Sequence, residues 1–353
     1  MAGTGTAHLR ESGDALLRIE ELEVQFPVGG GRTVKAVSGI SLDVLEGETM
    51  GLVGESGCGK STTGRAILQL PKPTGGRVVF EGVDLTGLSD NDVRAARRRM
   101  QLVFQDPISS LNPRRKVTDI VAEPLRIWKI GNEAERKAKV EEVLEVVGLD
   151  PAVAGPKRPH QFSGGQCQRI SIARALVLDP KLIICDEPVS ALDVSVQAQI
   201  LNLLEDMKAR YGLTLVFIAH DLAVVKNVSD RVAVMYLGKL CEVADPDRLY
   251  TSPAHPYTAA LLSAIPVPDP TQAGRRGMEL PGDPPSPVNP PSGCRFRTRC
   301  SRATDVCAEE EPLLRPVAGT QHDSDHVVAC HHPLVDVAVE APSRWPMAAP
   351  AGS

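Results

Sequence analysis

The chain has 353 residues, 42% hydrophobic and 24% charged, which is ordinary for a folded protein and long enough for two domains. A formal net charge of −5 and only 3% aromatic residues argue against nucleic-acid binding, because a basic surface and stacking rings are both lacking. No apolar run approaches the roughly 18 residues of a membrane-spanning helix, and the N-terminus lacks the apolar core of a secretion signal, so we expect a cytoplasmic protein that reaches membranes only through partners.

Residues 1–15 are small and polar without periodicity, which predicts disorder. The residues after them first alternate between apolar and polar, and then form short apolar runs bounded by glycine and proline. These patterns predict strands at residues 17–26, 33–44, 49–53, 77–80 and 102–104, and a helix over 61–70 that ends before Pro71.

Between about residues 107 and 165 the spacing becomes helical with many charged pairs, most clearly over 134–147, which predicts a helical insertion. Helices at 168–178 and 194–211 then alternate with strands at 181–185, 213–219 and 232–236. Alternating strands and helices indicate an α/β fold built on a parallel sheet.

From about residue 241 prolines become frequent, and we expect an extended segment with little regular structure. The expected organisation is a disordered N-terminus (1–15), a main α/β domain (16–245), a proline-rich extension with clustered cysteines (246–336) and a flexible tail (337–353).

The segment GESGCGKS, from Gly54 to Ser61, fits the phosphate-loop pattern G-x-x-x-x-G-K-[ST], with a strand before it and a helix after it. The glycines let backbone N–H groups surround phosphates, and the following helix points its positive end at them. Lys60 can reach the β- and γ-phosphates, and the Ser61 hydroxyl can ligate Mg²⁺. The context disfavours a chance glycine turn. The expected ATP-binding residues here are Gly54, Glu55, Ser56, Gly57, Cys58, Gly59, Lys60, Ser61 and Thr62.

Two carboxylates, Asp186 and Glu187, follow an apolar strand at the end where ligands bind in open α/β sheets. We expect Asp186 to hold Mg²⁺ and Glu187 to act as the general base that polarises the attacking water. The alternative is a strand that ends in a solvated acidic turn. The phosphate loop in the same chain strongly favours the Mg²⁺ and general-base interpretation over this alternative.

The segment FSGGQ, from Phe162 to Gln166, resembles the LSGGQ signature of ABC ATPases, with Phe162 where leucine is usual. The resemblance covers about residues 17–245 and implies a RecA-like P-loop core with a helical subdomain at about 107–165. In that family the signature caps the ATP bound to the opposite subunit of a head-to-tail dimer. The resemblance therefore assigns four more residues to ATP: Ser163, Gly164, Gly165 and Gln166.

Further residues stand where this family has its other motifs. Phe26 resembles the aromatic that stacks on adenine, although strand aromatics are more often packing residues. Gln105 matches the Q-loop glutamine, which touches Mg²⁺ or water and faces the membrane partner. Asp193 ends the segment SALD, which matches the D-loop that crosses the dimer interface, so the resemblance assigns Asp193 to ATP as well. His220 matches the switch histidine at the γ-phosphate. A lone histidine is more often structural, but this one follows a strand at the expected site.

Three segments give a narrower resemblance, to the C-terminal extension of oligopeptide and dipeptide importer ATPases: HPYTAALL from His255, PGDPPSP from Pro281 and GCRFRTRC from Gly293. It implies an F-type subunit that pairs with a D-type paralogue beneath two membrane permeases, at the cytoplasmic face of the membrane, and is served by an extracellular or periplasmic substrate-binding protein.

Three alternatives stay open to different degrees. Importers of nickel, glutathione or sugars belong to the same subfamily, and the sequence does not separate them, because other subunits select the substrate. A soluble ABC ATPase of DNA repair or translation would carry a long coiled-coil insertion or two ATPase halves, which this chain lacks. A module that binds ATP without hydrolysing it would need a damaged motif, and each catalytic position is intact.

The extension carries four cysteines in the spacing C-x5-C-x6-C-x22-C: Cys294, Cys300, Cys307 and Cys330. Four thiolates suit zinc or an iron–sulfur cluster, and the tight C-x2-C pairs of zinc ribbons are absent. Because importer ATPases with this extension carry a [4Fe-4S] cluster, the resemblance implies such a cluster here, with zinc and unligated thiols as alternatives.

Overall fold

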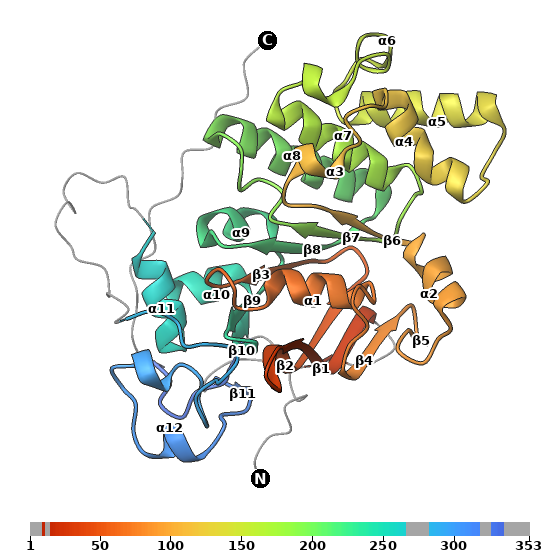
Figure 1. Ribbon diagram of the computed structural model, residues 1–353. Helices are drawn as coiled ribbons and strands as arrows, with labels where there is room; N and C mark the ends of the chain where they lie inside the picture. The colour runs from red at the N-terminus through yellow and green to blue at the C-terminus, as the bar shows by residue number, and fades with distance from the viewer. Residues whose placement is uncertain (1–8, 11–14, 266–281, 318–325, 335–353) are drawn as a thin grey trace, which may run out of the picture.

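The computed structural model describes residues 9–10, 15–265, 282–317 and 326–334, and in this part of the chain two β-sheets lie beside a group of helices (Figure 1). Nearly all of the expected disordered N-terminus, and the whole expected tail over 337–353, lie outside these residues. None of the helices described combines the length and the apolar character needed to cross a membrane.

The larger sheet has a parallel centre. Its strands follow in the order β11 (Arg315–Pro316), β12 (His326–Val328), β10 (Lys239–Ala244), β9 (Arg231–Tyr236), β3 (Thr49–Val53), β8 (Thr214–Ala219), β7 (Leu182–Asp186) and β6 (Met100–Val103). The five strands from β9 to β6 are parallel, whereas β10, β12 and β11 pair antiparallel. All residues of β3, β7 and β8 are buried, as expected for strands that are covered on both faces.

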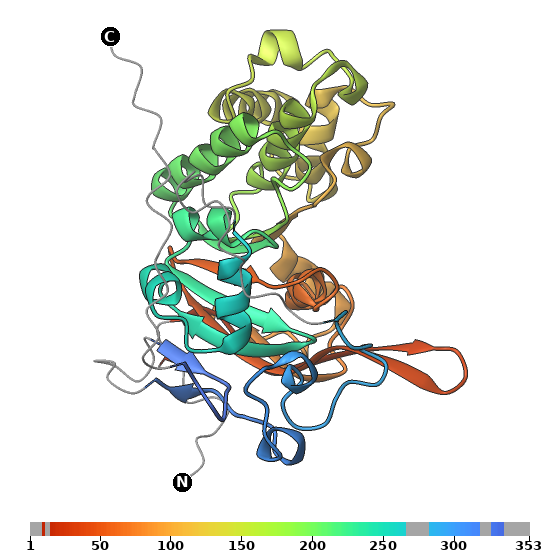
Figure 2. The ribbon, with the colours of Figure 1, turned by 90° about the vertical axis from the view of Figure 1, so that its left-hand side faces the viewer.

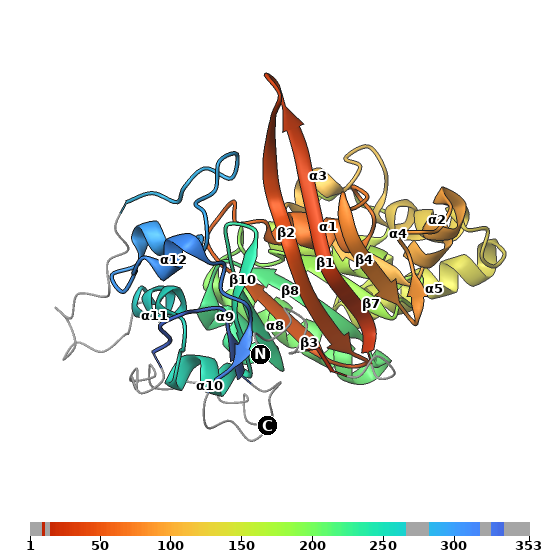
Figure 3. The same cartoon turned by 90° about the horizontal axis from the view of Figure 1, so that it is seen from below.

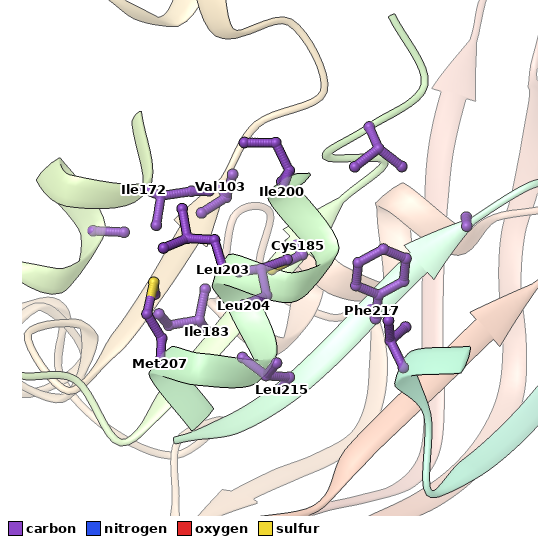
Figure 4. Packing of buried hydrophobic residues seen from close by; sticks show 14 of the residues in the cluster. Val103, Ile172, Ile183, Cys185, Ile200, Leu203, Leu204, Met207, Leu215 and Phe217 are labelled. Atoms are coloured by element: carbon purple, nitrogen blue, oxygen red, sulfur yellow. The ribbon is translucent and has the colours of Figure 1, made fainter. Parts of the chain in front are cut away.

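Alternate residues of the central strands pack on opposite faces of this sheet. On one face Ile183, Leu215 and Phe217 meet α8 (Val194–Tyr211) through Leu203 and Leu204 (Figure 4). On the other face, even-numbered residues of β3, β7 and β8 and odd-numbered residues of β9 join α1 (Lys60–Ile67) and the smaller sheet in a second cluster. The two-residue side-chain period of strands therefore divides the core into two layers of packing.

The smaller sheet is antiparallel, in the order β2 (Arg32–Leu45), β1 (Ala15–Val28), β4 (Gly75–Phe80) and β5 (Val83–Asp84). The β1–β2 hairpin is long, and its tip projects beyond the body of the molecule (Figures 2 and 3). Its turn contains Gly30 and Gly31, both with a φ of 71°. Phe26 pairs with Val34 near this tip, so the hairpin places that ring at the edge of the core.

The chain between β6 and β7 is helical, and these helices gather on one side of the sheet (Figure 2). They are α3 (Pro107–Ser110), α4 (Val117–Ile127), α5 (Glu133–Val146), α6 (Pro151–Ala154), the 3-10 turn η1 (Pro159–Gln161) and α7 (Gly164–Leu176). A capping box of Asn132 and Glu135 begins α5, which explains its sharp start. Between β5 and β6 lies α2 (Asp90–Arg97), and α9 (Leu222–Val228) follows β8.

The expectation of little regular structure after residue 241 is wrong for part of that segment. It forms β10 and then α10 (Pro246–Thr251) and α11 (Pro256–Ser263), with η3 (Arg297–Arg299) and α12 (Val306–Glu309) further on. Pro246 and Pro256 each occupy the first turn of a helix, behind the caps Asp245 and His255. Proline is favourable there, because the first N–H of a helix has no partner within the helix.

Candidate functional site

The phosphate loop connects β3 to α1, and two of its glycines are required by space and by backbone conformation. Gly54 has a φ of 153°, and a Cβ there would lie 2.1 Å from the Met235 carbonyl oxygen. Gly59 has a φ of 109°, and a Cβ there would lie 2.3 Å from the Ala36 carbonyl oxygen. Any side chain would push the loop away from these backbones, so the loop conformation depends on glycine.

Lys60 is held inside the loop by the loop's own carbonyls. Its Nζ donates to the carbonyl oxygens of Gly54 at 2.7 Å and Glu55 at 3.0 Å, and the side chain is buried. The ammonium therefore stands at the centre of the loop, with donors that can be transferred to phosphate oxygens.

Ser61 and Asp186, from different elements, bring oxygen ligands together beside this loop. The Ser61 hydroxyl, in the first turn of α1, donates to Asp186 Oδ1 at 2.6 Å at the end of β7. Asp186 Oδ2 is buried without a hydrogen-bond partner, and Arg65 lies 3.7 Å away from it. Burial raises the pKa of the Asp186 carboxyl, so a cation here would be favourable. A hydroxyl and a carboxylate are hard oxygen donors of the kind that Mg²⁺ prefers, so the residues fit the ion.

Glu187, which follows β7, is contacted by two side chains that follow the neighbouring strands β6 and β8. Gln105, which follows β6, donates through Nε2 to Glu187 Oε2 at 2.9 Å. His220, which follows β8, places Nδ1 3.2 Å from the same oxygen. Glu187 itself has a φ of 47°, a left-handed conformation that non-glycine residues seldom adopt, and its N–H donates to the Ile218 carbonyl at 3.0 Å. Such conformations persist where the surrounding structure fixes them and are common at functional sites.

These side chains line one open pocket of about 570 Å³. It is bordered by Phe26, Val34, Ala36, Ser56, Gly57, Gly59, Lys60, Ser61, Thr62, Gln105, Glu187, His220 and Pro287. Phe26 is 38% exposed, so its ring is open rather than packed in the core. Val34, Ala36 and Pro287 also line the pocket and were not predicted from the sequence. The alternation of Val34 and Ala36 on a strand opposite Phe26 could have indicated the first two.

Eight of the residues expected to bind ATP do not line that pocket: Gly54, Glu55 and Cys58 of the phosphate loop, and five residues of other elements, Ser163, Gly164, Gly165, Gln166 and Asp193. Ser163 caps α7, accepting from the Gln166 N–H at 3.3 Å, while Gln166 Oε1 accepts from the Ser163 N–H at 3.0 Å. Gly165 faces α8, where a Cβ would lie 2.4 Å from Val196 Cγ1, and Asp193 begins that helix. Gly164 has more room, with Leu192 Cδ2 the nearest atom at 3.5 Å.

The expected metal centre in the extension is wrong, both as a [4Fe-4S] cluster and as zinc. No group of three or more histidine, cysteine, aspartate or glutamate side chains among the described residues could hold a metal ion, and Cys294, Cys300, Cys307 and Cys330 are free thiols. Burial raises the pKa of Cys294, Cys300 and Cys330, which favours the protonated thiol over the thiolate that metals bind.

The same thiols and the histidines beside them have local partners instead. Cys330 Sγ accepts from the His332 N–H at 3.3 Å, and Cys307 Sγ lies 3.8 Å from Thr304 Oγ1. His332 Nε2 lies 2.7 Å from that same threonine hydroxyl. The spacing of cysteines in the chain therefore did not indicate how their sulfurs are arranged.

A phosphate loop between a central parallel strand and a helix, with two carboxylates at the end of a nearby strand, defines an ATPase of the P-loop class. The family described as ABC transporter matches residues 37–190, and the family described as oligopeptide/dipeptide transporter, C-terminal region, matches residues 241–307.

Individual proteins agree with this assignment. The oligopeptide transport ATP-binding protein OppF of Escherichia coli is 52% identical over 315 residues, 86% of this chain and 94% of that protein. The oligopeptide transport ATP-binding protein AppF of Bacillus subtilis is 49% identical over 326 residues, 90% and 97% of the two chains. A dimeric ATP-binding cassette solved in a post-hydrolysis state with ADP and Pi has 30% identity and a TM-score of 0.60, covering 65% and 98%. The chain belongs to the ABC transporter family of ATPases, and the resemblance seen in its sequence is confirmed.

Proposed function

We propose that this chain is the ATP-hydrolysing subunit of an ABC importer for oligopeptides or dipeptides. The observation that carries the catalytic part is the position of Glu187, which Gln105 and His220 hold in the same pocket as Lys60 and Ser61. The peptide substrate is supported by the names of the relatives and by the family that matches residues 241–307.

In the proposed binding mode, the loop N–H groups and Lys60 hold the β- and γ-phosphates. The exposed ring of Phe26 stacks on the base at the other side of the pocket. Ser61 and Asp186 would hold Mg²⁺, with Gln105 near enough to the catalytic carboxylate to assist through water. When bound, Mg²⁺ supplies positive charge that offsets the charge on the phosphate oxygens.

Hydrolysis follows from the carboxylate at the end of β7. Glu187 accepts a proton from a water whose oxygen attacks the γ-phosphorus, and the bond to the β–γ bridging oxygen breaks to give ADP and phosphate. Gln105 and His220 orient Glu187 through the oxygen that they share. His220 is also placed to contact the γ-phosphate, since it lines the same pocket as Lys60 and the phosphate loop.

The residues outside the pocket support a dimeric assembly. Ser163, Gly164, Gly165 and Gln166 form the start of α7 and do not line this chain's own pocket, so we assign them, together with Asp193, to the ATP of a second subunit. A D-type paralogue would be that second subunit. Two membrane permeases and a substrate-binding protein complete the proposed importer, with this chain held peripherally at the cytoplasmic face of the membrane.

The test is Glu187→Gln in the assembled transporter. We expect ATP binding to persist and turnover at this chain's own site to fall at least roughly 100-fold, the usual contribution of a general base. Glu141→Gln, on the exposed face of α5 beside Lys137, is the matched control and should behave as wild type. Unchanged turnover at the Glu187→Gln site would rule out the assigned base. Peptide uptake, measured against nickel and glutathione uptake, tests the substrate class.

A further inference from the structure

The C-terminal extension reaches the phosphate loop through one buried arginine. Arg299, at the end of η3, donates from Nη1 to Glu55 Oε2 at 2.7 Å and from Nη2 to Glu55 Oε1 at 3.1 Å. This two-pronged geometry is the strongest that a guanidinium and a carboxylate form, and it is rigid. Arg299 is only 7% exposed, and its guanidinium also faces the ring of Tyr236 on β9. The pair joins residues that are 244 positions apart.

A second contact holds the backbone of the same loop residue. The Glu55 N–H donates to the Tyr257 hydroxyl at 2.9 Å, from α11. The Tyr257 ring is fully buried and packs against Tyr236, with centroids 4.8 Å apart, and against Phe296 of the extension at 5.3 Å. Both the side chain and the backbone of Glu55 are therefore fixed by residues that follow the ATPase core in the chain.

The charge at this position makes the contact important for phosphate binding. Glu55 is the only carboxylate between Gly54 and Ser61, and its backbone oxygen already accepts from Lys60. If this carboxylate were unpaired, it would repel the phosphates and compete for the Lys60 ammonium. Paired with Arg299, it is neutralised and faces the extension.

We propose that Arg299 is a positioning residue for ATP: the extension orients and neutralises the phosphate loop through Glu55, so an ordered extension is required for tight nucleotide binding. The inference rests on the proposed ATP site and adds to it a control by the C-terminal extension. A second contact of the extension lies on the side of the pocket proposed to hold the nucleotide base. The Pro287 carbonyl accepts from the Lys35 N–H of β2 at 3.0 Å, and its neighbours on that strand, Val34 and Ala36, line the pocket.

The test measures ATP affinity and turnover in the full chain within its transporter, for Arg299→Met, Glu55→Gln and the double variant. Arg299→Met should weaken ATP binding roughly tenfold, as expected for loss of a charged hydrogen-bonded pair, and turnover at saturating ATP should change much less. In the double variant the unpaired carboxylate is absent, so affinity should recover most of that loss. Arg299→Lys, which keeps the charge but not the fork, should fall between wild type and Arg299→Met.

The matched control is Arg297→Met. Arg297 belongs to the same 3-10 turn but donates to Ser292, at 3.0 Å to its carbonyl oxygen, and should leave ATP affinity unchanged. Thermal unfolding of each variant separates loss of structure from loss of positioning. Wild-type affinity in Arg299→Met, or a double variant that binds ATP no better than Arg299→Met, would overturn the proposal. Failure of the wild-type chain to bind ATP would instead count against the proposed function.

Discussion

At the scale of the residue, Lys60 illustrates how a buried charge is prepared for its ligand. Its ammonium is satisfied by two carbonyls of its own loop, so phosphate oxygens replace good partners rather than water. We expect Lys60→Met to weaken ATP binding by roughly 10- to 100-fold, because charged hydrogen bonds to the phosphates are lost. Equilibrium binding of a fluorescent ATP analogue measures this. Lys72→Met, at a surface lysine paired with Asp90, is the control, and a similar loss there would contradict the assignment.

At the same scale, the sequence indicated which residues belong to the site better than it indicated their contacts. Gln105, Glu187 and His220 follow three different strands, and parallel strands bring their carboxyl ends to one edge, so their gathering could be anticipated. That Gln105 and His220 share one oxygen of Glu187 could not be predicted, because it depends on rotamers and on the positive φ of Glu187. The cysteines failed as predictors since spacing along a chain does not fix distances between sulfurs.

At the scale of the element, α11 begins with a cap that is sensitive to pH. His255 Nδ1 accepts from the Tyr257 N–H at 3.0 Å, and burial lowers the pKa of His255 from 6.5 to about 4. Between pH 6.5 and about 4, His255 is protonated in the unfolded chain but neutral in the folded chain. The free energy of unfolding therefore falls as the pH falls through this range. Between pH 7.5 and 5.5 this residue should cost roughly 1 kcal/mol of unfolding free energy.

The comparison that checks this is urea unfolding of His255→Asn at both pH values. Asparagine keeps a capping oxygen but does not titrate, so the variant should lose less stability on acidification, even though it is less stable overall. His160→Asn replaces an exposed histidine and should retain the wild-type pH dependence. A variant with the full wild-type dependence on pH would show that another group titrates.

The predicted bounds of helices and strands were most accurate where the pattern of buried residues is regular along the whole element. The strand at residues 49–53 and the helix at 194–211 agree with β3 and α8, because one is wholly buried and the other has a long amphipathic pattern. Both α10 and α11 were not predicted, because the prolines of this segment were interpreted only as residues that interrupt helices. Proline is also favourable in the first turn, where Pro246 and Pro256 stand. The start of α7 was placed too late, because two glycines in its first turn concealed the capping box of Ser163.

At the scale of the whole molecule, the phosphate loop and the FSGGQ segment belong to different parts of the subunit. The pocket is built on the sheet and the β1–β2 hairpin, whereas α7 belongs to the helices that gather on one side (Figure 2). No residue of the FSGGQ segment lines the pocket, so in the proposed reaction a second subunit brings its own FSGGQ segment to the ATP bound here. The clearest test alters the FSGGQ segment without disturbing the subunit that carries it.

Gly164 allows that test. A Cβ at Gly164 would make only ordinary contact with Leu192, at 3.5 Å, and an acidic residue in the first turn of α7 suits the helix dipole. We therefore expect Gly164→Asp to fold and to bind ATP at its own phosphate loop as wild type does. In the assembled transporter its carboxylate would face the partner's γ-phosphate, and repulsion should reduce coupled turnover at least roughly tenfold.

The internal comparison is Gly165→Ala, which presses on Val196 at 2.4 Å and should instead lower stability. Thermal unfolding, ATP binding and transporter ATPase activity, measured for both variants, separate the two effects. If Gly164→Asp keeps full turnover, the FSGGQ segment does not face a nucleotide, and the head-to-tail arrangement fails with it. If its own ATP binding is lost, the segment acts within one subunit, which would be unexpected because no residue of α7 is among those that line the pocket.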